Sequence, residues 1–205
     1  MQSIKFKWTG IRPLIMSNPQ TVSISNPYAV RSRKLTAALK AAKRKGDEDR
    51  LVALELEQRR NDFESSAYFD NQGFFLPDTV ILACLKEAAR TLRKGKDIDR
   101  AVLLSDDTIR IHNRTSIPFT SIDAVFENPA FRLETPCRVP PKTGVLIWKC
   151  RCMMPTGWSI TFSVEYSEDL IVDKTLVDIS SLAGALVGLG GWRPKFGRFS
   201  SEVVS

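Results

Sequence analysis

The segment WSITFSVEY, residues 158–166, constrains the fold of this chain more than any other part of the sequence. Apolar residues at every second position alternate without exception with serine, threonine and glutamate. Successive side chains of a β-strand point to opposite faces, so this pattern predicts a strand with one face in a core and one in water. Residues 3–8, SIKFKW, have the same period, with Ile4, Phe6 and Trp8 as the apolar set. We therefore expect both segments to belong to a half-buried sheet.

Two amphipathic segments predict helices that pack on this sheet. The first opens at Pro77 and Asp78, carries a wide apolar surface up to Leu92, and is expected to stop at Gly95. The second covers roughly residues 175–187 and repeats its apolar residues at helical spacing.

Further strands complete the expected order of elements. Residues 101–104 and 108–112 predict a short hairpin, and residues 144–152 predict a strand that pairs with residues 158–166 across a turn. Residues 113–143 have little regular pattern, and an edge strand through residues 203–204 closes the chain. The order strand, helix, strand pair, strand pair, helix, strand describes a ferredoxin-like, RRM-related fold.

The fold class that we predict is α+β, with two helices on one face of an antiparallel ferredoxin-like sheet. Residues 1–30 and 65–205 are expected to form this domain, and residues 31–64 are expected to be an inserted helical hairpin. Gly46 is a natural helix stop, and Asp47 follows it where a second helix would begin. The other face of such a sheet is free, and sheets of this kind commonly bind single-stranded nucleic acid through aromatic stacking.

Positive charge is concentrated at the two ends of the chain. The formal net charge is +7, yet residues 1–46 hold ten lysines and arginines and no acid, whereas residues 47–64 hold seven acids and three arginines. Residues 179–201 add three cations, again without an acid. This segregation is expected of a protein with a basic groove that follows a phosphate backbone, although a solvated lysine-rich helix would explain one cluster alone.

The segment GLGGWRPKFGRF, residues 188–199, combines glycines, cations and aromatic rings. Glycines let a backbone approach a phosphate closely and expose N–H donors, and the cations would add charge to that cradle. Trp192, Phe196 and Phe199 could stack on bases. The alternative stays open that Gly188 is a helix cap, that Gly190 and Gly191 form a turn, and that the rings cover the core.

This ending, the sequence G-x-x-P-L at residues 10–14 and the ferredoxin-like order resemble the RAMP superfamily, which includes the backbone subunits of CRISPR effector complexes. The ending is most similar to uncharacterised RAMP-like proteins of bacteriophages and mobile elements. In that family a glycine-rich loop after the last helix lies beside bound RNA, and backbone subunits wrap a single strand head to tail. The resemblance assigns the RNA-contacting role to the glycines and cations of the loop: Gly188, Gly190, Gly191, Arg193, Lys195, Gly197 and Arg198.

Evidence for catalysis is thin, so we predict that the protein is not an enzyme. The sole histidine, His112, lies between Arg110 and Arg114 and is expected to be a surface or RNA-contacting residue. The four cysteines have no zinc-knuckle spacing and are expected to be reduced thiols, with no metal and no cofactor. Apolar stretches are far shorter than the roughly 20 residues that cross a bilayer, so we expect a cytoplasmic protein, in a bacterial host if a phage encodes it.

The function that we predict is non-enzymatic binding of single-stranded nucleic acid, RNA in preference to DNA, as a repeating protomer along the strand. The alternative is a phage-borne interaction protein that mimics a CRISPR backbone subunit and enters or inhibits a host CRISPR complex. The candidate binding residues are the cations of the N-terminal part and the loop: Arg12, Arg31, Arg33, Lys34, Lys40, Lys43, Arg44, Lys45, Gly188, Gly190, Gly191, Trp192, Arg193, Lys195, Phe196, Gly197 and Arg198.

Overall fold

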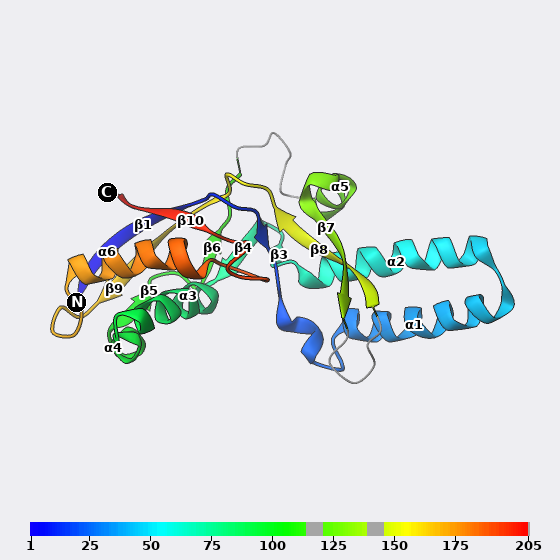
Figure 1. Ribbon diagram of the computed structural model, residues 1–205, viewed down its shortest axis with the longest axis horizontal. Helices are drawn as coiled ribbons and strands as arrows, with labels where there is room; N and C mark the ends of the chain where they lie inside the picture. The colour runs from blue at the N-terminus through cyan, green and yellow to red at the C-terminus, as the bar shows by residue number, and fades with distance from the viewer. Residues whose placement is uncertain (114–120, 139–145, 205) are drawn as a thin grey trace. The chain divides into compact units, whose positions relative to one another are not determined.

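The computed structural model describes residues 1–113, 121–138 and 146–204, and its chain divides into two compact units (Figure 1). The first, which we call the sheet unit, comprises Met1–Ile15, Tyr68–Ser121 and Met154–Ser205. The second, the hairpin unit, comprises Met16–Ala67 and Ile122–Met153.

The sheet unit is built on a four-stranded antiparallel sheet in the order β10-β1-β9-β5. Its strands are β1 (Gln2–Gly10), β5 (Val102–Leu104), β9 (Ser159–Tyr166) and β10 (Phe199–Val204). In chain order, helix α3 (Asp78–Thr91) comes between strands β1 and β5 of this sheet. Helix α6 (Asp173–Leu182) comes between β9 and β10, and a π-helical turn, η3 (Ala183–Val187), continues it. This is the ferredoxin-like arrangement of two β-α-β halves, so the predicted α+β class is confirmed.

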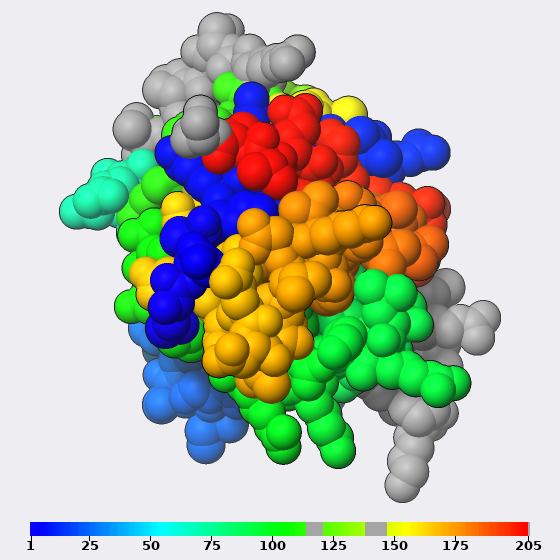
Figure 2. All heavy atoms as spheres, turned by 90° about the vertical axis from the view of Figure 1, so that its left-hand side faces the viewer, coloured from blue at the N-terminus to red at the C-terminus, as the bar shows by residue number. Residues whose placement is uncertain are grey.

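The core of the sheet unit lies between one sheet face and the helices α3 and α6. Phe6 pairs with Phe162 and Trp8 with Ile160 across β1 and β9, and all four side chains are buried. The Trp8 indole stacks on Phe199 with ring centroids 4.1 Å apart, and its Nε1–H donates to Ser180 Oγ of α6 at 2.8 Å. Figure 2 shows β10 in red beside β1 in dark blue, with α6 in orange next to them.

The opposite face of this sheet is polar. Lys5 pairs with Ser163, and Lys7 lies between Thr161 and Glu202. The described residues of β1 and β9 that alternate away from the core carry no aromatic ring. The expectation of aromatic stacking on this face is therefore wrong for β1 and β9, because their aromatic residues all occupy the core side.

The sequence predicted that β5 and β6 form a hairpin with each other. In the structure, each of them pairs with a different strand. β6 (Thr108–Arg110) joins β3 (Phe69–Asp70) and β4 (Gly73–Pro77) in a second sheet, with Ile109 opposite Leu76, whereas β5 pairs with β9. The predicted hairpin is wrong because both strands find apolar partners elsewhere in the chain.

The helix predicted to begin at Pro77 also ends earlier than the sequence indicated. Helix α3 ends at Thr91, and Arg93 then adopts a left-handed φ of 58°. Gly95 opens the short helix α4 (Gly95–Ala101), so its expected role as a helix stop is wrong.

The hairpin unit contains the predicted pair of helices, α1 (Pro27–Lys45) and α2 (Glu48–Ser66). The Asn26 side chain caps α1 by accepting from the Tyr28 N–H at 2.9 Å, and Gly46 ends the helix in the left-handed conformation. Asp47 caps α2 by accepting from the Arg50 N–H at 3.1 Å. A small apolar cluster joins the two helices: Leu35, Ala42 and Leu54, flanked by Ala38, Leu39 and Leu51.

The rest of the hairpin unit has more regular structure than the sequence indicated. The 3₁₀ turns η1 (Pro19–Val22) and η2 (Pro129–Phe131), helix α5 (Ile122–Glu127) and strand β7 (Arg132–Arg138) are all present. Strand β8 (Leu146–Met154) pairs antiparallel with β7, with Trp148 opposite Pro136. The predicted pairing of β8 with β9 is therefore wrong, and Pro136 is tolerated because β7 is an edge strand.

We expect the buried aromatic pair of β1 and β9 to dominate the stability of the sheet unit. Replacing Phe162, which is 2% exposed, by Ala should lower the free energy of unfolding by about 3–5 kcal/mol, because burial is lost and a cavity remains. Urea denaturation measures the change. The control Thr161→Ala, on the exposed face of the same strand, should stay within about 0.5 kcal/mol, and equal losses for the two variants would contradict this core.

Candidate nucleic-acid interface

Hydrogen bonds of its own backbone stabilise the loop between η3 and β10. Gly188 ends η3 with a φ of 78°, and its N–H donates to the Ala183 carbonyl at 2.8 Å. The Gly188 carbonyl accepts from Cys84 Sγ of α3 at 3.3 Å. Leu189, which is fully buried, donates its N–H to the Gly197 carbonyl at 2.9 Å and so closes the loop.

The same loop is hydrogen-bonded to the segment that leaves β1. The N–H of Gly191 donates to the Ile15 carbonyl and that of Gly197 to the Pro13 carbonyl, both at 2.8 Å. In return, the N–H groups of residues 11 and 12 donate to the Arg198 carbonyl at 2.9 and 3.1 Å. Residues 10–15, which include the short strand β2 (Leu14–Ile15), and residues 188–198 therefore form one backbone frame.

The glycines have a structural role in this frame, because the backbone passes too close to them for a side chain. A Cβ on Gly190 would collide with the Ile15 carbonyl, and a Cβ on Gly197 with the Leu189 carbonyl. Both residues also have φ near +70°, which favours glycine. The expectation that the loop glycines expose their N–H groups to a phosphate is wrong for Gly188, Gly191 and Gly197, because these donors are used inside the protein.

Side chains of this frame line a hollow of about 610 Å³ that we call the Pro194 groove. Arg12, Lys195 and Arg198 line it, and no carboxylate does. In the part of the chain that the structure describes, no carboxylate lies within 4.0 Å of these three cations. The remaining lining residues are Pro13, Pro194 and Phe196.

Internal contacts orient two of the cations in the Pro194 groove. Arg198 Nε donates to the Pro194 carbonyl at 2.9 Å, and Lys195 Nζ lies 5.5 Å from the centroid of the Phe196 ring. Pro13 was not among the predicted site residues; the G-x-x-P-L sequence that contains it was the available signal.

A second hollow of about 600 Å³ also has Pro194 in its lining, together with Trp192 and Arg193. Trp192 is 40% exposed, and its ring centroid lies 6.3 Å from that of Phe196. Phe199 is 3% exposed and stacks on Trp8, so the hypothesis that it could stack on a base is wrong. Two of the three proposed stacking rings thus remain accessible.

The cations of α1 belong to the hairpin unit. Arg31 lies 3.9 Å from Glu64 of α2, and Arg33 donates from Nη2 to the Ile24 carbonyl at 2.6 Å. The other cations of α1 are exposed, and no ion pair joins them to a described carboxylate: Lys34, Lys40, Lys43, Arg44 and Lys45. The last three lie in the final helical turn, where they also complement the helix dipole. The assignment of nucleic-acid contacts to the cations of α1 stays a prediction.

The remaining residues that sequence analysis considered have local roles. His112 exchanges backbone hydrogen bonds with Ser159 at 2.7 and 2.8 Å. Burial raises the pKa of the Cys84 and Cys150 thiols to about 12, so both are protonated at neutral pH. Among the described residues no group of three His, Cys, Asp or Glu could hold a metal ion, and no helix is long and apolar enough to cross a membrane. Arg114 lies outside the described residues.

Comparison with known proteins finds a likeness in fold. No family model matches the chain, and no curated protein matches it. A chain in the cryo-EM structure of the type III-B Cmr-beta bound to cognate target RNA superposes with a TM-score of 0.52 at 11% sequence identity. The match covers 99% of this chain and 58% of that chain. The likeness agrees with a RAMP-like fold, whereas the resemblance to phage and mobile-element proteins stays a prediction.

The backbone frame predicts that Gly197 is far less replaceable than another left-handed glycine of the sheet unit. Gly157→Ala should cost about 1–2 kcal/mol of unfolding free energy, because its φ is +92° but a Cβ there meets nothing within 4 Å. Gly197→Ala should cost at least twice as much, since its Cβ also collides with the Leu189 carbonyl. Chemical denaturation of the two variants compares them, and similar losses would contradict the frame.

Proposed function

We propose that this protein binds single-stranded nucleic acid, preferentially RNA, without cleaving it, and that several copies lie along one strand. In this proposal the strand passes through the Pro194 groove of the sheet unit. The exposed cations of α1 are a second set of candidate phosphate contacts, in the hairpin unit. No residue is assigned a catalytic role.

The Pro194 groove is the observation that carries the proposal. Three cations line it, and no described carboxylate neutralises them. Their mutual repulsion is unfavourable unless an anion binds. Arg12 and Arg198 are planar donors suited to phosphate oxygens, and Lys195 adds a compact charge. A nucleic-acid backbone neutralises such a set and releases its condensed counterions.

The accessible rings beside the groove support a single strand as the ligand. Trp192 and Phe196 lie on the same loop as Arg193, Lys195 and Arg198, and unpaired bases can stack on exposed aromatic rings for about 1–3 kcal/mol each. The bases of a duplex are already stacked and would gain nothing from these rings. The hydrogen-bonded frame also holds the loop in place before binding, which lowers the entropy lost on association.

The fold likeness supports RNA over DNA. The matching chain belongs to a complex whose structure was determined with cognate target RNA bound. The preference for RNA over DNA and the binding of several copies along one strand are tested separately below.

Removing the loop cations should weaken strand binding and reduce its salt dependence. The variant Arg193→Ala, Lys195→Ala, Arg198→Ala should bind unstructured RNA on the order of 100-fold more weakly. The slope of log K against log salt should fall by about 2, at roughly 0.7 per phosphate contact. Fluorescence anisotropy across a salt series with labelled RNA measures both quantities.

A matched control removes equal charge from the same unit. Lys5, Lys7 and Lys174 are exposed and lie on β1 and α6, outside the loop. Their triple replacement by alanine should change the affinity no more than about threefold, a general charge effect. Equal losses in both triple variants, or an unchanged salt slope in the loop variant, would contradict the Pro194 groove as the binding site.

Strand type and stoichiometry are tested on the unmodified protein. We expect RNA to bind more tightly than DNA of the same sequence, and light scattering to show complexes whose mass grows with strand length. One copy per strand at every length would contradict the repeated arrangement while leaving the strand-binding proposal intact.

A further inference from the structure

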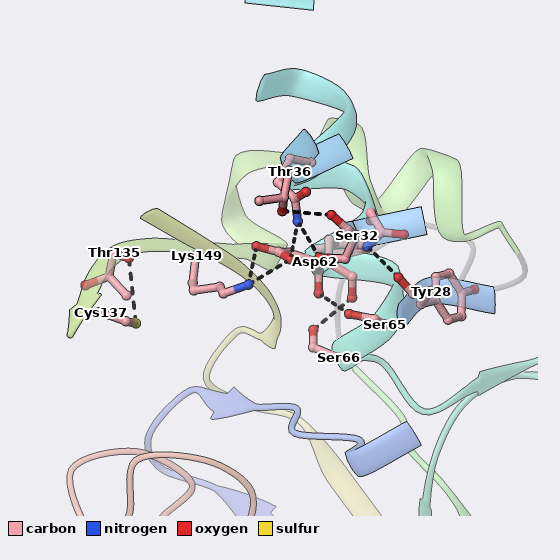
Figure 3. A network of polar contacts seen from close by, with 12 residues as sticks. Tyr28, Ser32, Thr36, Asp62, Ser65, Ser66, Thr135, Cys137 and Lys149 are labelled. Atoms are coloured by element: carbon pink, nitrogen blue, oxygen red, sulfur yellow. Dashed lines mark hydrogen bonds and ion pairs between the residues drawn. The ribbon is translucent and has the colours of Figure 1, made fainter. Parts of the chain in front are cut away.

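A separate pocket in the hairpin unit lies among α1, α2 and β8. Its volume is about 310 Å³, at the lower end of the range of about 300–1,000 Å³ for small-molecule sites. Figure 3 shows Asp62 joined to Lys149 by dashed contacts, with Ser32 of α1 and Ser65 of α2 close by. Asn61 and Arg33 also line this space, which we call the Asn61 pocket.

Asn61 presents a buried acceptor with no partner. The residue is only 1% exposed, and its Nδ2 donates to the Tyr28 carbonyl at 3.2 Å. Oδ1 has no hydrogen-bond partner among the described residues. Because the Tyr28 carbonyl can only accept, it fixes the amide with its nitrogen toward Tyr28 and its oxygen away from it. An unsatisfied buried acceptor is costly, and a ligand with an N–H donor would remove that cost.

The carboxylate in the pocket is already satisfied. Asp62 is 8% exposed, and its two oxygens accept from Lys149 Nζ at 3.0 and 3.1 Å. Oδ1 also accepts from Gln58 Nε2 at 2.9 Å. A cationic ligand therefore gains little from Asp62. Among the described residues that line the pocket, the buried side-chain oxygen without a partner is Asn61 Oδ1.

Two cations at this site have donors to spare. Lys149 carries three N–H donors, and its side chain is 33% exposed although it pairs with Asp62. Arg33 is exposed, and its one observed hydrogen bond, to the Ile24 carbonyl, occupies part of a five-donor guanidinium. With two cations and one carboxylate, the lining has an excess of positive charge suited to an anion.

We propose that the Asn61 pocket binds one nucleotide whose base carries an exocyclic amino group, cytosine or adenine. The amino group donates to Asn61 Oδ1, and the phosphate pairs with Arg33 and Lys149. The choice of a nucleotide among molecules with an amino group and an anion rests on the proposed function. Binding in this pocket depends on the base, whereas stacking on aromatic rings tolerates any sequence.

Cytidine and uridine monophosphate form a matched pair of probes. They share the ribose and phosphate, but cytosine offers an amino donor where uracil has a carbonyl acceptor. That carbonyl would face the oxygen of Asn61, so two acceptors would meet. Calorimetric titration of the wild-type protein should give at least tenfold tighter binding for the cytidine nucleotide, about 1.4 kcal/mol. Equal affinities, or no binding of either, would overturn the pocket.

The variant Asn61→Leu removes the acceptor at similar volume. We expect it to bind both nucleotides with the weak affinity of the uridine nucleotide, whereas the control Ser23→Ala, at an exposed hydroxyl outside the pocket lining, should keep the tenfold preference. Arg33→Met should weaken both nucleotides equally, because it removes a phosphate contact and leaves the acceptor. A preference that persists in Asn61→Leu would contradict the assignment, and thermal unfolding checks that this variant folds. If Asn61→Leu does not fold, the comparison of the two nucleotides on the wild-type protein and the Arg33→Met variant test the proposal.

The experiment separates this inference from the proposed function. The loop variant Arg193→Ala, Lys195→Ala, Arg198→Ala should lose strand binding but keep the preference for the cytidine nucleotide. Wild-type protein that binds RNA strands but neither nucleotide would refute the pocket alone. Protein that discriminates the nucleotides but binds no strand would refute the strand proposal, and the pocket would stand as a site for free nucleotides.

Discussion

The pairing of β1 on both of its edges is the constraint on which the candidate site depends. Gly10, at the end of β1, pairs with Phe199 of β10, and its N–H donates to the Trp158 carbonyl at 2.7 Å. Because β1 and β10 are antiparallel, the chain leaves β1 at the same end of the sheet where it enters β10. Residues 11–15 and 188–198 are therefore brought together, although they lie at opposite ends of the sequence.

This geometry changes what the glycine-rich loop can do. Its glycines allow backbones to pass at hydrogen-bond distance, as the N–H groups of Gly191 and Gly197 show. In the proposed function, ligand recognition therefore rests on the side chains of the loop and not on these glycine N–H groups. Arginine, lysine and aromatic side chains suit a ligand with regularly spaced charge and flat, unpaired bases.

The hairpin unit contributes a different kind of chemistry. Its helices share only a small apolar cluster, and a polar network around Asp62 and Lys149 links α2 to β8. Among the described residues of this unit, two buried side-chain oxygens have no partner, Gln58 Oε1 and Asn61 Oδ1, and of these two residues only Asn61 lines the pocket. Buried polar groups are normally paired, and an exception is a place to look for a missing partner.

Local sequence patterns are enough to predict the secondary structure of the strongest segments and the sign of the charge. Strands at residues 3–8 and 158–166, a helix starting at Asp78, the helical hairpin and the basic loop could all be predicted, because hydrophobic period, helix caps and charge are local properties. Strand partners could not be predicted: β5, β6 and β8 all pair differently from the expectation, because alternation specifies the strand state but not the neighbour. The inward hydrogen bonds of the loop glycines and the shared pocket of Asn61 and Lys149 could not be predicted in this way, because both depend on contacts between residues far apart in the chain.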